Sequence, residues 1–190
     1  MPDVSRETKE KLDSYYEILM HWNRTISLTE VLNKNDYYAR HINDGLVLFD
    51  LLKSENKPIV DLGSGCGIPA IPLMILGLKI TMVESVRKKS VFLNHVMKNF
   101  ALSGSVLNQR VEEIFFEKPI IVIARALKPL NNLLEYMNSV SRETVGFFIK
   151  GERIDEEIDE AERNWSFSYQ VYDGVIEGVV IRVDNVVRKM

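Results

Sequence analysis

The sequence predicts an α/β fold, a mostly parallel sheet of seven strands with helices on both faces and a helical N-terminal extension. From Pro58 onward, short apolar runs alternate with amphipathic stretches, which is typical of parallel strands joined by crossover helices. Before that point, apolar residues recur at helical spacing. A glycine-rich turn between the first apolar run and the next amphipathic stretch completes the pattern.

Composition and length indicate one globular domain, which we expect to span residues 1–190. The chain has 190 residues, of which 46% are hydrophobic and 27% charged, unlike disordered, collagenous or membrane proteins. We expect residues 1–53 to form the extension and residues 58–190 the sheet-containing core. A chain of this length buries roughly 70% of the surface that its unfolded form exposes, so it needs no disulfide.

Cysteine usage and the N-terminal sequence predict a cytoplasmic protein. Cys66 is the single cysteine, so no internal disulfide forms and a reducing compartment fits. The segment Met1–Glu7 lacks the apolar stretch of a signal peptide. Since no apolar run approaches the roughly 20 residues that cross a bilayer, we expect no membrane partner.

The N-terminal extension is predicted to contain two helices. Ser5 is suited to cap the first, and five apolar residues recur behind it at helical spacing. These residues are Leu12, Tyr15, Tyr16, Leu19 and Trp22. The second helix is expected from about Asp36 to Leu52.

The core is predicted to contain seven strands separated by helices. The expected strands are Ile59–Leu62, Ile80–Glu84, Val106–Gln109, Ile120–Ala124, Gly146–Ile149, Ser168–Tyr172 and Val179–Val183. Helices are expected to begin near Pro69, Arg87, Leu130 and Arg153. No repeat or low-complexity tract interrupts this order.

The charge distribution is uneven. The net charge of −3 argues against strong nonspecific attraction to nucleic acid. Seven acids and two arginines between Glu152 and Arg163 give a local charge of −5, so the other 178 residues sum to +2. We interpret this segment as a solvated acidic helix, which leaves room for a basic face elsewhere.

The segment from Asp61 to Pro69 carries the most information about function. Gly63, Gly65 and Gly67 leave no Cβ in the way of a ligand that approaches the backbone. A dinucleotide fingerprint needs its third glycine one residue later, and no Gly-Lys-Ser/Thr of a P-loop follows. The loop instead resembles motif I of S-adenosylmethionine-dependent methyltransferases. A glycine turn that binds no ligand is the alternative.

Glu84 ends the second predicted strand, about twenty residues beyond the loop, where α/β nucleotide folds present an acid to ribose hydroxyls. A carboxylate accepts hydrogen bonds from both hydroxyls of a vicinal diol. We therefore interpret Glu84 as a ribose ligand, with an ordinary polar strand end as the alternative.

Metal binding and cysteine catalysis are not indicated. His21, His41 and His95 match no metal-ligand spacing, and one cysteine supplies no zinc site. None of these histidines lies near Cys66 in sequence to activate it, so we expect Cys66 to be a small buried residue.

Basic residues follow several predicted strands. Arg87, Lys88 and Lys89 come after Glu84, Arg125 and Lys128 follow the fourth strand, and Lys150 ends the fifth. Because the carboxyl ends of parallel strands share one edge, Arg125 and Lys150 should lie near the glycine loop. Arg40 and His41 fall in the extension, where His41 is either an RNA contact or a buried residue that orders the extension.

Taken together, these segments resemble the bacterial small-subunit rRNA methyltransferase family RsmG, formerly GidB. The resemblance covers nearly the whole chain in order. Its segments are Leu19–Asn23, Leu28–Thr29, Arg40–Asp44, Asp61–Leu73, Glu84–Lys89, Phe92–Leu93, Arg110–Glu112, Arg125–Ala126 and Lys150–Gly151. The Gly-Ile-Pro-Ala-Ile-Pro-Leu continuation from Gly67 is more specific to the family than the glycines themselves.

This resemblance implies a Rossmann-like class I methyltransferase that moves the methyl group of S-adenosylmethionine to N7 of a guanosine in the 530 loop of 16S rRNA. Carried over by position, the family's cofactor contacts are Gly63, Ile68, Val111, Glu112 and Arg125. With the loop and strand-end residues, the expected cofactor site also includes Asp61, Gly65, Gly67 and Glu84. The RNA-binding candidates are Arg40, His41, Arg87, Lys88 and Lys150.

Four positions depart from the family pattern. Glu84 stands where the family often has Asp, Gly45 replaces a common Ser, and Cys66 replaces Ala or Pro. The segment from Glu177 to Ile181 lacks a basic residue often found before it. These departures bear on RNA contacts more than on the cofactor site.

The chemistry of guanine N7 needs no general base, because this nitrogen carries a lone pair and no proton. We therefore expect catalysis by positioning, in which no residue is assigned a catalytic step and Arg125 and Lys150 are the candidates for the positioning role. The expected substrate is 16S rRNA in a small-subunit particle, and we expect a monomer without metal. A small-molecule methyltransferase and a noncatalytic RNA-binding or ribosome assembly factor are the alternatives.

Overall fold

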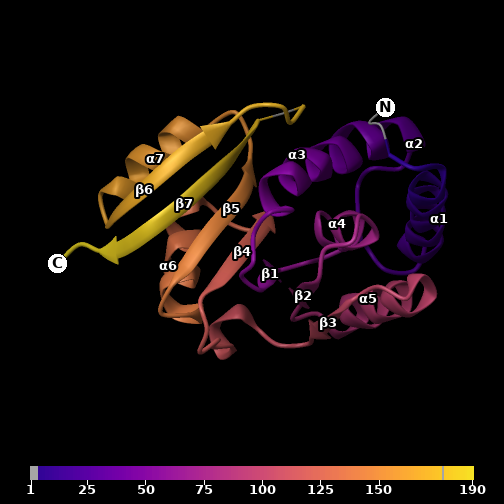
Figure 1. Ribbon diagram of the computed structural model, residues 1–190, viewed down its shortest axis with the longest axis horizontal. Coiled ribbons are helices and arrows are strands. Elements are labelled where there is room, and N and C mark those ends of the chain that lie inside the picture. The colour runs from indigo at the N-terminus through magenta and orange to yellow at the C-terminus, as the bar shows by residue number, and fades with distance from the viewer. Residues whose placement is uncertain (1–3, 177) are drawn as a thin grey trace.

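The computed structural model describes residues 4–176 and 178–190, which form one sheet with helices on both faces (Figure 1). The sheet has seven strands in the order β3-β2-β1-β4-β5-β7-β6. The strands from β3 to β5 run parallel, and β7 is antiparallel to both β5 and β6. The predicted mostly parallel seven-stranded α/β fold is therefore confirmed. Residues 1–3, where the segment considered for a signal peptide begins, and Glu177, where the departing last segment begins, lie outside the described residues.

The strands lie close to their predicted positions. They are β1 Ile59–Leu62, β2 Ile80–Val83, β3 Gly104–Leu107, β4 Ile120–Arg125, β5 Thr144–Lys150, β6 Trp165–Tyr172 and β7 Val179–Arg188. The third was predicted two residues too late, because Gly104 already pairs with Ile80. A Cβ at Gly104 would lie 2.0 Å from the Ile80 carbonyl oxygen, so this pairing requires glycine.

The helices surround this sheet. They are α1 Arg6–Asn23, α2 Lys34–Asp36, α3 Asn43–Leu52, α4 Ala70–Ile75, α5 Arg87–Phe100, α6 Leu130–Val140 and α7 Ile154–Glu162. A π-helix, Tyr37–Ile42, and a 3₁₀-helix, Val111–Glu113, complete the elements. No helix over the described residues is long and apolar enough to cross a membrane.

Alternate residues of the buried strands pack into two hydrophobic cores. In β4, Ile121 and Ile123 join the core shared with α1, α3, α4 and α5, whereas Val122 and Ala124 join the core shared with α6 and α7. Figure 1 shows α6 and α7 behind β5, β6 and β7. Burying one aliphatic side chain contributes about 1.5–3 kcal/mol, so strands that are apolar on both sides require helices on both faces.

Helix α1 of the extension packs against α4 and α5 through its apolar stripe. Ser5 caps α1, since its Oγ accepts a hydrogen bond of 3.1 Å from the Thr8 amide, as predicted. Leu12, Tyr15 and Leu19 are fully buried on one side of α1. The first predicted helix is therefore confirmed.

The second predicted helix of the extension is interrupted. Instead of one helix from Asp36 to Leu52, the chain forms α2, a π-helical segment and α3. A π-helix has hydrogen bonds between residues five positions apart, instead of four as in an α-helix. Such segments are frequent at functional sites. Apolar spacing alone does not reveal this change, and its consequence is that His41 lies on the π-helical segment, buried against Tyr37.

Candidate active site

The loop between β1 and α4 has a bare backbone. Gly63, Gly65 and Gly67 have φ angles of 65°, 56° and 85°, in the left-handed region that favours glycine. A Cβ at Gly63 would lie 2.4 Å from Leu127 Cδ1, and one at Gly67 would lie 2.5 Å from Ile71 Cγ1. The φ angle favours glycine at all three positions, and at Gly63 and Gly67 the close neighbours favour it as well. This leaves a cradle of backbone without side chains at the carboxyl end of β1, in which the Gly67 amide donates to the Ser64 carbonyl oxygen at 2.7 Å.

Glu84 holds this cradle from the end of β2. Its Oε2 accepts a hydrogen bond of 2.8 Å from the Gly65 amide, and its Oε1 accepts one of 2.7 Å from the Val86 amide. The side chain is buried, yet each carboxylate oxygen has a second acceptor site. The structure thus brings together two predicted site residues that are 19 positions apart.

Asp61 lies beneath the same loop and is fully buried. Burial raises the pKa of its carboxyl group to about 8, against a lowering by the Ser64 hydroxyl and with a further increase from the negative charge of Glu84. Its Oδ2 has no hydrogen-bond partner among the described residues. Buried oxygens are rarely left unsatisfied in native proteins, so this atom fits a polar or cationic ligand group.

Helix α1 supports the loop from behind. The Tyr15 hydroxyl donates a hydrogen bond to the carbonyl oxygen of Cys66, and its ring packs edge-on against Tyr37. Burial raises the pKa of the Cys66 thiol above its usual range, so the thiol stays protonated at neutral pH. Cys66 is partly buried, and its protonated thiol fits a packing role better than a nucleophilic one.

Arg125, at the end of β4, is held by two residues of the extension. Its Nη1 lies 2.5 Å from His41 Nδ1, and its Nη2 lies 3.5 Å from Asp44 Oδ2. Arginine only donates, so Nδ1 accepts and the ring proton is on Nε2. Burial, together with the charge of Arg125, lowers the pKa of His41 to about 4. Among the described residues the buried Nε2 has no hydrogen-bond partner.

A cavity of about 900 Å³ opens at the carboxyl ends of β4 and β5. Its walls include Arg40, Asp44, Arg125, the segment 126–129, Ile149, Lys150, Gly151, Glu152, Arg153, Glu157 and Ile176. Five of these residues are basic and three acidic, and the basic side chains of Arg40, Lys128 and Arg153 are exposed. The cavity therefore combines a half-buried arginine, Arg125, with a predominantly basic rim.

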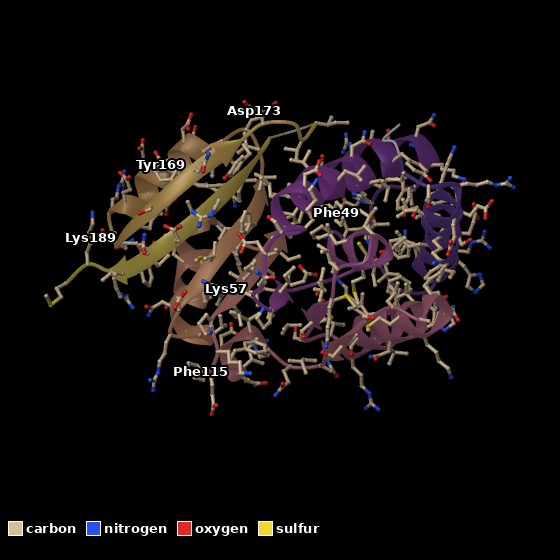
Figure 2. The ribbon with its side chains drawn as sticks, viewed as in Figure 1. Phe49, Lys57, Phe115, Tyr169, Asp173 and Lys189 are labelled. Atoms are coloured by element: carbon tan, nitrogen blue, oxygen red, sulfur yellow. The ribbon has the colours of Figure 1, made fainter. Side chains whose placement is uncertain are left out.

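The connection between β6 and β7 closes this cavity on the side of α3. The Ile176 amide lies 3.3 Å from Asp44 Oδ1 and donates to it, and a Cβ at Gly174 would lie 3.3 Å from Val47. Asp173 marks this connection above α3 (Figure 2). Asp44 thus joins Arg125 to a distant hairpin, a role not assigned from the sequence, although Asp44 belongs to the Arg40–Asp44 segment.

The predicted RNA-binding residues do not form one group. Arg40 and Lys150 line the cavity, whereas His41 is buried behind Arg125. Arg87 and Lys88 are exposed at the start of α5, outside the described lining of the cavity. The cavity edge and the start of α5 are therefore separate candidate surfaces.

Lys150 is more enclosed than a surface contact. Its side chain is 9% exposed, and its Nζ donates to Glu157 Oε2 at 2.6 Å and to the Lys128 carbonyl oxygen at 3.0 Å. Glu157 belongs to the acidic segment interpreted as a solvated helix, and that interpretation is wrong for this residue. Its carboxylate instead binds Lys150 at the end of β5 and the Leu130 amide at the start of α6.

The segment after β3 lies beside Glu84. The side-chain amide of Asn108 donates to the carbonyl oxygens of Glu84 and Ser85 at 2.8 and 3.1 Å. Val111 is buried at the start of the 3₁₀-helix, and the exposed Glu112 accepts a hydrogen bond of 3.1 Å from the Tyr136 hydroxyl. Sequence reasoning missed Asn108 because the predicted strand Val106–Gln109 included it, whereas β3 ends at Leu107 and leaves Asn108 just beyond the strand.

Comparisons with known proteins agree with this geometry. A family model described as rRNA small subunit methyltransferase G matches residues 8–179. A protein named ribosomal RNA small subunit methyltransferase G from Gluconobacter oxydans is 36% identical over 190 residues, which cover 97% of each chain. One of the same name from Rickettsia felis is 30% identical over 191 residues, 99% of each chain.

Solved structures show the same fold. A methyltransferase from Geobacter sulfurreducens has a TM-score of 0.64 at 13% identity, over 97% of this chain and 92% of the other. Magnesium protoporphyrin IX methyltransferase from Synechocystis, solved with bound SAM, has a TM-score of 0.61 at 12% identity, over 97% and 99%. At these identities the likeness extends to the fold alone.

Proposed function

Since the chain belongs to the rRNA small subunit methyltransferase G family, and is thus an S-adenosylmethionine-dependent rRNA methyltransferase, we propose that it methylates N7 of a guanosine in the 530 loop of 16S rRNA. The family match over residues 8–179 is the observation that carries this proposal. The glycine cradle beside a basic-rimmed cavity supports it, because donor and acceptor sites must adjoin in any methyl transfer.

The residues at the cradle fit the cofactor. We propose that the peptide groups of Gly63, Gly65 and Gly67 hold it and that Glu84 accepts hydrogen bonds from its ribose. The unsatisfied Oδ2 of Asp61 suits its ammonium group. Ile68, Val111 and Glu112 are proposed as further contacts, in agreement with the family resemblance. When bound, the cofactor supplies an electrophilic methyl group on its sulfonium.

The residues of the chain would act mainly by positioning. Guanine N7 attacks through its own lone pair, so no residue has to remove a proton. Aligning two reactants can supply several kcal/mol of the reduction in barrier. Because the modified base becomes cationic, Arg125 fits contacts to the cofactor or to a phosphate or O6 better than a place beside N7. Its attachment to His41 and Asp44 holds it in one place for that role.

The acceptor side favours RNA over a small apolar molecule. Arg40, Lys128 and Arg153 are exposed around the cavity, and exposed cations suit a phosphate backbone. A net charge of −3 gives little nonspecific attraction to phosphates, so we propose that the protein recognises folded rRNA within a small-subunit particle. We also propose that it is a cytoplasmic monomer. A small-molecule methyltransferase would instead need an enclosed apolar acceptor site.

The test is transfer of labelled methyl groups from S-adenosylmethionine to small-subunit particles from cells that lack the gene. The modified base is then mapped. Labelling at one guanine N7 in the 530 loop is the expected result. Absence of labelling with demonstrated cofactor binding would contradict the substrate and favour a small-molecule acceptor. Failure to bind the cofactor would favour an assembly factor.

A further inference from the structure

The loop between β4 and α6 separates the glycine cradle from the cavity. Leu127 lies against Gly63, as the 2.4 Å distance from a Cβ at Gly63 to Leu127 Cδ1 shows. Leu127 also lines the cavity, as do the residues on either side of it, Ala126 and Lys128. Ala126 has a φ angle of 50°, a conformation that costs a non-glycine residue energy and persists only where surrounding contacts impose it.

An enclosed ion pair supplies such contacts at the far end of this loop. Lys150 Nζ donates to the Lys128 carbonyl oxygen at 3.0 Å and to Glu157 Oε2 at 2.6 Å. The same Glu157 oxygen accepts a hydrogen bond of 2.6 Å from the Leu130 amide. Two side chains, from the end of β5 and from α7, thus hold the backbone on both sides of Pro129.

We propose that Lys150 and Glu157 are positioning residues, which hold the loop 126–129 so that Leu127 lies over the cradle and Ala126 and Lys128 shape the acceptor side. The proposal rests on the proposed methyl transfer, since that reaction gives the loop its role. In this role Lys150 holds the loop together with Glu157 and does not contact RNA directly.

The environment of Lys150 favours this role over phosphate binding. Only 9% of its side chain is exposed, and its ammonium group already donates to a carboxylate and a carbonyl oxygen. A phosphate would have to compete with both. Lys128 and Arg153 on the rim of the same cavity are exposed and need no such exchange.

The experiment is a double-mutant cycle of Lys150→Met and Glu157→Gln in the full chain. Glu157→Gln removes the charge but keeps an acceptor for the Leu130 amide. Lys57→Met and Glu143→Gln are the control, because Lys57 and Glu143 form an ion pair of the same 2.6 Å length on a more exposed part of the surface. Lys57, labelled in Figure 2, precedes the start of β1, whereas Lys150 is the last residue of the parallel strand β5. Steady-state kinetics and amide hydrogen exchange are measured for every variant.

Lys150→Met and Glu157→Gln are each expected to lower kcat about tenfold, with the KM for RNA within about threefold of wild type. The double variant should lose no more kcat than either single variant, because the two residues act through one contact. In Lys150→Met the Leu130 amide should exchange about tenfold faster. The control pair should change kcat less than about twofold. A raised KM in Lys150→Met with normal kinetics in Glu157→Gln would overturn the proposal in favour of an RNA contact.

Hydrogen exchange separates this proposal from the proposed function. If the wild type methylates no rRNA but exchange at Leu130 still rises in Lys150→Met, the proposed function fails while the restraint of the loop is supported. Unchanged exchange at Leu130 overturns the proposal whatever the activity. Faster exchange with an unchanged kcat in an active enzyme overturns the positioning role.

Discussion

Nδ1 of His41 lies 2.5 Å from Nη1 of Arg125, across 84 positions of sequence. This contact joins the N-terminal extension to the end of a central strand and fixes a neutral imidazole against a permanent cation. Asp44, one turn further along the extension, lies near the other guanidinium nitrogen. The extension is therefore part of the site and determines where Arg125 lies.

Replacing His41 should show whether its Nδ1 sets the position of Arg125. His41→Asn keeps an oxygen acceptor close to the place of Nδ1, whereas His41→Leu removes it. We expect His41→Leu to reduce kcat/KM about tenfold and His41→Asn to retain most of it, because one buried hydrogen bond to a charged group contributes about 1.5–3 kcal/mol. Steady-state kinetics on small-subunit particles measure this, and equal losses in both variants would contradict it.

The pH dependence of stability should report the same contact. The pKa of His41 is lowered to about 4, so between that value and the ordinary 6.5 the unfolded chain binds more protons than the folded one. His41 therefore makes the free energy of unfolding fall as the pH is lowered from about 6.5 toward 4. Urea unfolding at several pH values should show a smaller decrease in His41→Asn. Parallel curves for the two proteins would refute this assignment.

Asp61 should have the opposite pH signature. Its pKa is raised from 3.8 to about 8, so between these pH values the folded chain keeps a proton that the unfolded chain releases. The contribution of Asp61 to the free energy of unfolding is therefore lost as the pH rises from about 3.8 through 8. Asp61→Asn should remove this loss. The same variant should bind S-adenosylmethionine at least about tenfold more weakly, since an amide cannot become anionic beside an ammonium group. Calorimetry at pH 7 tests the affinity, and a wild-type value would remove Asp61 from the cofactor site.

Gly63 and Gly77 form a matched pair for testing the cradle. Both have positive φ angles, 65° and 106°, but a Cβ at Gly77 meets no atom within 4 Å. Gly77→Ala should therefore show the backbone cost alone, about 1–2 kcal/mol. Gly63→Ala should cost more, because its Cβ would lie 2.4 Å from Leu127 Cδ1, and Gly63→Ala/Leu127→Ala should recover the difference. Chemical unfolding measures all three, and equal losses for the two single variants would show that Leu127 is not crowded.

Local patterns predicted the central sheet well, since burial on both faces makes its strands continuous apolar runs. β1 lies at its predicted residues, and the predicted glycine-rich turn follows it. The residues that meet at the carboxyl edge, such as Glu84 and Gly65, followed from the rule that parallel strands end together.

Side-chain pairing between distant segments was less accessible. Nothing in local spacing indicates that the extension turns through a π-helix and brings His41 to Arg125, because that contact depends on how α3 packs on the sheet. The ion pair of Glu157 could not be predicted either, because the sequence of the acidic segment does not distinguish this carboxylate from its solvated neighbours. Tertiary packing, and not composition, selects which charge is enclosed.

Arg125→Ala should distinguish a cofactor contact from an RNA contact. Removing the guanidinium withdraws a partner from the buried Asp44 and His41, so the variant should be less stable by up to about 3 kcal/mol and must be compared where both proteins are folded. Calorimetric titration with S-adenosylmethionine should then show at least about a tenfold weaker affinity, about 1.4 kcal/mol, if Arg125 contacts the cofactor. Arg125→Lys, which keeps the charge but not the two-pronged donor geometry, should lie between wild type and Arg125→Ala. An unchanged cofactor affinity together with a raised KM for small-subunit particles would instead assign Arg125 to the RNA side of the cavity.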